Sequence, residues 1–171
     1  MKKAFTLIEL LVVIAIIAIL SGVVMSQFSV AKAKSRDGKR IADIAQLQLA
    51  IQLYFDRCNQ YPNSTNGLLD INSGNGGTSG CPAGITVGTF LNKLPTPPAY
   101  PTDAGYVYSY MVHKTGTVND DYYIYTTLET KNAALDDDVD GTLTLTTGWT
   151  PASTVNFGAP TTDTVYAVRA K

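Results

Sequence analysis

The order of hydrophobic and polar positions divides the chain into a long helical part and a β-rich part. Residues 10–25 are apolar except for Ser21 and Gly22, and no charged residue follows Glu9 until Lys32. A helix rises about 1.5 Å per residue, so about 20 apolar residues span a bilayer. Residues 6–27 have this length, and the pattern predicts that they form a membrane-inserted helix.

The next segment, residues 26–57, contains no proline and has apolar residues at spacings of three and four. This period predicts that the helix continues and becomes amphipathic. The residues at these spacings are Ile41, Ile44, Gln48, Ile51 and Phe55, with Ala45, Leu47 and Tyr54 beside them. The expected polar face carries Arg40, Asp43, Gln46 and Asp56.

The part after Pro62 reads as loops followed by strands. Turn residues fill 63–84, a short helical turn is expected over 89–94, and a proline-rich extended segment covers 94–101. Alternating residues predict strands over 106–112 and 121–128, joined as a hairpin through 114–119, with weaker strands over 142–147 and 164–169. The expected fold class is α+β, in which a long N-terminal helix packs on a small antiparallel sheet.

Glu9 is the exceptional residue of the apolar segment. A carboxylate in hydrocarbon costs about 2 kcal/mol or more unless it is paired, which marks it as a functional candidate. No Lys, Arg or His lies one helical turn away. A cut between Ala4 and Phe5 would create an α-amine at the start of the apolar segment. That amine, from the same or a neighbouring molecule, could pair with Glu9.

The residues Lys3-Ala4-Phe5-Thr6-Leu7-Ile8-Glu9-Leu10, followed by an aliphatic run, resemble the class III signal of type IV pilins and type II secretion pseudopilins. The resemblance implies that a prepilin peptidase cuts between Ala4 and Phe5 and methylates Phe5. It also implies that Glu9 pairs with the N-terminus of an adjacent subunit during filament assembly. Ala4 departs from the glycine that the family usually has there.

The resemblance continues from Arg40 to Tyr61-Pro62 and covers about the first 62 residues. It implies a leader over 1–4, a helix over 5–57 with residues 6–27 in the membrane or filament core, and a pilin-like head over 58–171 outside the cell membrane. Two other interpretations remain open. Residues 18–22 could imitate the cleavage site of an ordinary secretory signal, or the segment could be an uncleaved anchor with an incidental glutamate.

In an exported head, Cys58 and Cys81 are expected to form a disulfide. The net charge of the whole chain is −1, but the charge is unevenly distributed. Residues 32–57 hold more basic than acidic side chains, and residues 58–171 hold more acidic ones. A basic stem and an acidic head do not indicate a nucleic-acid-binding surface on the head.

The one candidate metal site is the run of residues 136–141. Asp136, Asp138, Asp140 and Gly141 match positions one, three, five and six of a calcium loop. The twelfth position is Thr147 instead of glutamate, so a complete EF-hand is excluded. The resemblance to pseudopilins, which bind calcium late in the head, favours Ca²⁺ as an optional ligand. A solvated acidic turn is the alternative.

No enzymatic activity is expected, because the sequence has one histidine, His113, and no glycine-rich phosphate loop. The resemblance instead implies a structural subunit of a type IV pilus-like filament. The expected partners are further copies of the chain, prepilin peptidase, the inner-membrane assembly machinery and, before assembly, membrane lipid. The expected location is the inner membrane for the precursor, and a surface filament or periplasmic pseudopilus after assembly. The alternatives are a pseudopilin that acts as a type II secretion piston and a membrane-anchored surface binding module.

Overall fold

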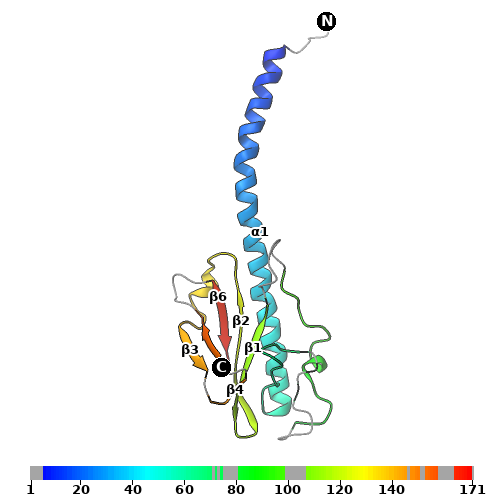
Figure 1. The fold of residues 1–171 in the computed structure, drawn as a ribbon. Coiled ribbons are helices and arrows are strands. Elements are labelled where there is room, and N and C mark those ends of the chain that lie inside the picture. Colours follow the sequence, from blue (N-terminus) through cyan, green and yellow to red (C-terminus); the bar gives the residue numbers. More distant parts are fainter. Residues whose placement is uncertain are drawn as a thin grey trace. The chain divides into compact units, whose positions relative to one another are not determined.

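The computed structural model of the chain describes residues 6–70, 72, 74, 81–98, 107–145, 147–150, 153–157 and 164–170. These residues fall into two units, 1–35 and 36–171, and each is described by itself below. The α+β prediction is confirmed: one long helix, α1 (Leu7–Cys58), accompanies small antiparallel sheets (Figure 1).

In the first unit, the described side chains of α1 show no covered apolar face. Large apolar side chains are exposed around the whole helix, for example Leu7, Ile14 and Val24 at 81%, 57% and 64% of their surface. In water, burial of apolar surface would not stabilise this part of the helix, because these apolar side chains face outward. Its composition therefore requires another apolar environment.

In the second unit, α1 has one buried face that packs on the head. The fully or nearly fully buried side chains recur at spacings of three and four, namely Ile44, Leu47, Ile51, Tyr54 and Cys58. The predicted polar face is wrong at two positions, because Arg40 is 0% exposed and Asp43 is 8% exposed. Ala45, which was expected beside the apolar face, is exposed. The buried face is thus turned toward Arg40 and away from Ala45.

The main sheet has four strands in the order β4-β1-β2-β6. Strands β1 (Ser109–Thr115) and β2 (Val118–Thr127) form an antiparallel hairpin through a two-residue turn, Gly116-Thr117. Strand β6 (Val165–Arg169) pairs with β2, and the short β4 (Trp149–Thr150) pairs with β1. The predicted hairpin and the strand over 164–169 are present, with ends that differ by up to three residues.

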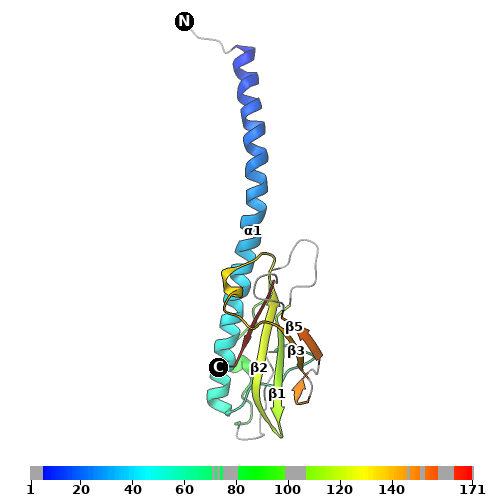
Figure 2. The same cartoon turned by 90° about the vertical axis from the view of Figure 1, so that its left-hand side faces the viewer.

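A second, two-stranded sheet of β3 (Thr142–Leu145) and β5 (Ser153–Asn156) forms a further layer. Figure 2 shows the order of layers in this unit: α1, then the four-stranded sheet, then β3 and β5. Alternate residues of the hairpin therefore enter two different cores. Tyr110 and Ile124 pack toward α1, whereas Met111 and Tyr123 pack with Phe157. The sequence did not predict β4, β5 or this second core.

Two 3₁₀ turns complete the second unit, η1 (Val87–Thr89) and η2 (Ala133–Leu135). The helical turn expected over 89–94 lies two residues earlier, because Thr86 forms a reciprocal capping box with Thr89 and starts the turn there. Its apolar neighbours Phe90, Leu91 and Leu94 still pack on the core of α1 and the sheet.

A buried group of charges joins α1 to the segment that follows β2. Nη1 of Arg40 lies 2.7 Å from Oδ1 of Asp37 and 2.7 Å from Oε1 of Glu129. The Nε of Arg36 donates to Oε1 of Glu129 at 2.8 Å, and the same two side chains form a second contact through Nη2. The side chains of Arg40 and Asp37 are 0% exposed, and that of Glu129 is 5% exposed.

The backbone completes this cluster of Arg36, Asp37, Arg40 and Glu129. The Asp37 carboxylate accepts hydrogen bonds of 2.8 Å from the backbone N–H groups of Glu129 and Thr130 and from the Thr130 hydroxyl. Arg40 also donates to the carbonyl oxygen of Pro98 at 2.8 Å. Three segments that are far apart in the sequence are therefore held at one point, since charged groups are tolerated in an interior only when they are paired and hydrogen-bonded.

Glu129→Gln is expected to lower the free energy of unfolding by about 3 kcal/mol, because removal of one partner leaves buried arginine charge uncompensated. The fluorescence of the single tryptophan, Trp149, during urea unfolding of the full chain in detergent micelles provides the measurement. Asp56→Asn is the matched control: its carboxylate is exposed and, among the described residues, accepts a hydrogen bond from Gln52 alone, so its effect should stay within about 0.5 kcal/mol. Equal losses in the two variants would contradict a special role for the buried cluster.

The same cluster predicts how stability depends on pH. Hydrogen bonding from Arg36, followed by that from Arg40, lowers the pKa of Glu129 below its ordinary value of 4.5. A depressed carboxylate pKa contributes stability above the ordinary value, and this contribution disappears as the pH falls through the lowered value. Urea unfolding between pH 6 and pH 3 should therefore show a steeper loss for the wild type than for Glu129→Gln.

Candidate functional site

Glu9 begins α1 as part of a capping box with Thr6. The Thr6 backbone N–H and the Thr6 hydroxyl both donate to Oε2 of Glu9, at 2.8 and 2.7 Å, and the Glu9 N–H donates to the Thr6 hydroxyl oxygen at 3.3 Å. This reciprocal pair satisfies donors that the first turn of a helix leaves without partners. Thr6 was not among the predicted site residues, although the Thr6-x-x-Glu9 spacing before an apolar run is the sequence signal for this box.

The geometry leaves one side of the Glu9 carboxylate open to a second donor. Both Thr6 contacts use Oε2, and no contact to Oε1 occurs among the residues that the structure describes. An ionised carboxylate accepts several hydrogen bonds, so capping and pairing with an ammonium group are compatible. Ala4 and Phe5, the predicted processing residues, lie outside the described residues.

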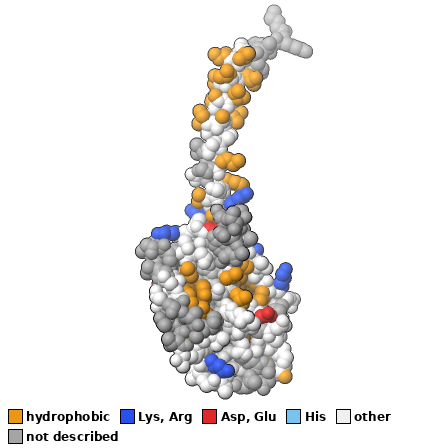
Figure 3. All heavy atoms as spheres, viewed as in Figure 1, with side chains coloured by type: hydrophobic (Ala, Val, Ile, Leu, Met, Phe, Trp, Pro, Cys, Tyr) orange, Lys and Arg blue, Asp and Glu red, His pale blue; other side chains and the backbone are white. Residues whose placement is uncertain are grey.

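The first unit presents an apolar surface around Glu9. The helix is long and apolar enough to span a membrane, on length and composition. Figure 3 shows hydrophobic side chains over this part of the helix, with blue Lys or Arg side chains where the apolar surface ends. Ile8, Leu10, Val12 and Val13 surround the carboxylate and leave it exposed in the isolated chain.

In the second unit, Cys58 and Cys81 form a disulfide. Both cysteines are buried, together with Tyr54 and the partly buried Ile85 and Phe90. The Tyr54 hydroxyl lies 3.5 Å from the Cys81 sulfur. The disulfide therefore joins the last residue of α1 to the segment that leads into η1.

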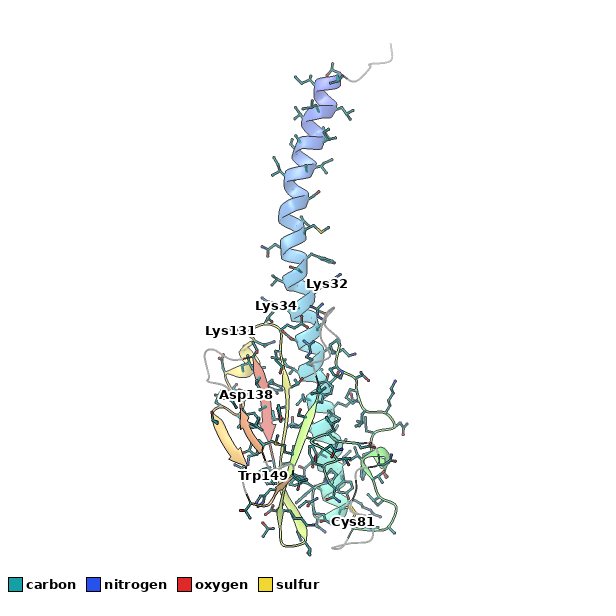
Figure 4. All side chains as sticks on the ribbon, in the orientation of Figure 1. Lys32, Lys34, Cys81, Lys131, Asp138 and Trp149 are labelled. Carbon is teal, nitrogen blue, oxygen red and sulfur yellow. A yellow bond between two sulfur atoms is a disulfide. The ribbon has the colours of Figure 1, made fainter. Side chains whose placement is uncertain are left out.

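Asp138 of the candidate calcium loop forms a hydrogen bond to the outer edge of β6. Oδ2 of Asp138 accepts from the Ala167 N–H at 2.8 Å, and the Val139 N–H donates to the Ala167 carbonyl oxygen at 3.0 Å. Ala167 lies on the outer edge of β6, opposite its pairing with β2. Capping such an edge prevents further strand addition, and Figure 4 shows Asp138 beside this strand.

The other predicted calcium ligands do not converge with Asp138. Asp136 is exposed, and no group of three Asp, Glu, His or Cys side chains placed to hold a metal occurs within the described part of the chain. Oδ1 of Asp140 is buried and has no hydrogen-bond partner among the described residues, and Oδ1 of Asp138 is buried as well. A buried carboxylate oxygen is satisfied by a donor, water or an ion. The calcium prediction therefore now depends on these two buried oxygens.

Comparison with known proteins gives a match at the same N-terminal segment. The family described as "Prokaryotic N-terminal methylation motif" matches residues 1–25. Type II secretion system core protein G from Pectobacterium carotovorum subsp. carotovorum is 34% identical over 67 residues, and its namesake from Aeromonas hydrophila is 36% identical over 67 residues. These matches confirm the predicted resemblance to type IV pilins and type II secretion pseudopilins.

The similarity of this chain to the two core proteins is partial. Each match covers 39% of the chain, and the chain spans 43% and 47% of the length of the two relatives. No solved structure matches the chain. The predicted resemblance over about 62 residues thus agrees in extent with matches of 67 residues.

Calcium is expected to raise the temperature of unfolding through Asp140, because a cation would satisfy its buried oxygen. Thermal unfolding of the full chain in detergent micelles with 1 mM CaCl₂, compared with 1 mM MgCl₂, measures the effect. Asp140→Asn should abolish the difference between the two cations, whereas exposed Asp56→Asn should preserve it. Identical unfolding temperatures of the wild type with the two salts would show that the loop serves only as a turn and strand-edge cap.

Proposed function

We propose that this chain is a structural subunit of a pilus-like filament and, more specifically, a pseudopilin of the type II secretion kind. The observation that supports this best is the N-terminal methylation motif in a chain similar to two proteins named type II secretion system core protein G. This similarity puts the pseudopilin alternative ahead of a surface pilus. The role is mechanical, and catalysis forms no part of it.

Packing of the apolar helix supports the assembly step. Outside lipid, burial of the exposed apolar side chains of this segment is favourable. It lowers the free energy by about 25 cal/mol for each Å² of apolar surface that is removed from water. Copies of the same helix offer such a surface to one another. Repeated contacts that do not close into a ring produce an open helical polymer.

In this proposal Glu9 sets the register between neighbouring subunits. Hydrolysis of the Ala4–Phe5 bond by prepilin peptidase would release the leader and leave an ammonium group on Phe5. Oε1 of Glu9 then accepts from the ammonium group of a neighbouring subunit while Oε2 keeps its contacts with Thr6. A carboxylate in an apolar filament core is tolerated only where such a partner meets it, so misaligned subunits are disfavoured.

Processing is tested by the intact mass and N-terminal sequence of the protein isolated from cell membranes. The expected chain begins at Phe5 and carries one additional methyl group on its N-terminus. A chain that begins near Ser21 would indicate an ordinary secreted protein. A chain that retains Met1 would leave the anchored surface module as the function.

The role of Glu9 is tested by variants that separate charge from helix capping. Glu9→Gln keeps an oxygen that can accept from Thr6 but removes the charge, and it should reduce the yield of oligomers crosslinked between copies by about tenfold or more. Thr6→Val removes the capping hydroxyl but keeps the charge, and its yield of crosslinked oligomers should stay near that of the wild type. Immunoblots of membrane fractions before and after chemical crosslinking provide both measurements, and both variants should remain in the membrane before assembly.

The opposite pattern would overturn the proposed charge pairing. If Thr6→Val lost crosslinked oligomers while Glu9→Gln formed them normally, Glu9 would act through the capping box alone. The comparison requires equal amounts of protein in the membrane fractions, which the same immunoblots report.

A further inference from the structure

The first charged residues after the apolar segment are lysines, and they lie on the side of the membrane opposite to Lys2 and Lys3 in the proposed topology. Lys32, Lys34, Arg36, Lys39 and Arg40 follow one another within nine residues. Basic residues normally favour the cytoplasmic side of a membrane helix. Their presence on the other side therefore requires a structural or functional reason.

The two arginines of this group have such a reason, because both pair with Glu129 and Arg40 also pairs with Asp37. Lys32 and Lys34 differ from them. Both lysines are exposed, and no ion pair with a carboxylate occurs for either among the described residues. Their charges are therefore left for a partner outside the chain.

The position of the two lysines on the helix indicates the shape of that partner. Successive residues of an α-helix are about 100° apart, so Lys32 and Lys34 point to nearly opposite sides. Figure 4 shows them leaving the helix on opposite sides. A protein docked on one face of the helix would engage one lysine, whereas lipid headgroups surround the helix and can engage both.

The local contacts also suit a membrane boundary. The Nζ of Lys32 lies 4.6 Å from the centroid of the Phe28 ring, and Phe28 is 55% exposed. The lysine stem can therefore lie along apolar surface while the ammonium group remains at the polar end of the segment. Along the helix, the apolar ring of Phe28 comes before the charge of Lys32. This is also the order of hydrocarbon and headgroups at a membrane boundary.

We propose that Lys32 and Lys34 form a binding collar for the phosphate groups of anionic phospholipids on the translocated side of the membrane. This collar sets the depth of the subunit before assembly. The uncharged segment 10–31 is about 33 Å long at 1.5 Å per residue, close to the thickness of a hydrocarbon core of about 30 Å. With Lys32 at one boundary, Glu9 lies at the other boundary and not within the hydrocarbon.

The inference rests on the membrane insertion that the proposed function includes, and it concerns only the lipid partner. Native mass spectrometry of the full chain in mild detergent, with equal amounts of phosphatidylglycerol and phosphatidylcholine, measures which lipid is retained. Each lysine near an anionic surface contributes a factor of about five, so the wild type should prefer phosphatidylglycerol by about tenfold or more. The preference should decrease in 1 M salt, where charges are screened over about 3 Å.

Three double variants make the test specific. Lys32→Gln with Lys34→Gln should bring the ratio of the two lipids close to one, and Lys32→Arg with Lys34→Arg should keep the preference of the wild type. Lys93→Gln with Lys114→Gln is the matched control, because it removes the same charge from exposed lysines of the second unit. An unchanged preference in the Lys32/Lys34 glutamine variant, or an equal loss in the control, would overturn the proposal.

Two further measurements distinguish the lipid collar from a failure of membrane insertion and from a protein interface. Alkaline carbonate extraction reports membrane insertion: release of the wild type would refute insertion itself, whereas retention without lipid preference would refute only the collar. Chemical crosslinking reports contacts between copies. Loss of crosslinked dimers in the glutamine variant, with an unchanged lipid ratio, would assign the lysines to a protein interface and overturn the lipid proposal.

Discussion

One continuous helix has to satisfy two different environments, and the rest of the structure follows from this constraint. Residues 10–25 are apolar except for Ser21 and Gly22, which suits hydrocarbon or the core of a filament. From residue 36 it needs only one covered face. Asp37 and Arg40 begin that face, and they are buried because Glu129 and the backbone after β2 satisfy their charges. The cluster thus fixes where the folded head begins on the helix.

The four-stranded sheet of the head has two apolar faces to cover from water and two edges that could pair with other strands. The hydrophobic face of α1 covers one face, and the core around Phe157 covers the other. Where the short β4 does not cover β1, the Tyr110 N–H donates to the Gly67 carbonyl oxygen at 2.7 Å. At the β6 edge, Asp138 and Val139 pair with both backbone groups of Ala167. These contacts occupy backbone groups that could otherwise pair with a strand of another chain.

Glu9 illustrates how one side chain can carry out two tasks. Its carboxylate caps the first turn of α1 through Oε2, and the helix N-terminus favours a negative charge there. The other oxygen is directed to the surroundings of the isolated chain. The capping box holds the side chain in one orientation, so in the proposed assembly the ammonium group of a neighbouring subunit would meet an acceptor that is already positioned.

The sequence by itself determined the elements whose signals are local. The apolar run and the period of three and four determined α1 to within two residues at its start and one at its end, and strand alternation determined the β1–β2 hairpin. The motif around Ala4, Phe5 and Glu9 indicated the resemblance to pilins and pseudopilins, because it lies within ten consecutive residues. Tertiary structure decided the burial of Arg40, the edge-capping role of Asp138, and the second core under β3 and β5. Each of these depends on a partner that is distant in sequence: Glu129 is 89 positions from Arg40, and Ala167 is 29 positions from Asp138. A local sequence pattern predicts that a charged residue lies on the surface. Only the folded chain places the distant partner beside it that makes its burial favourable.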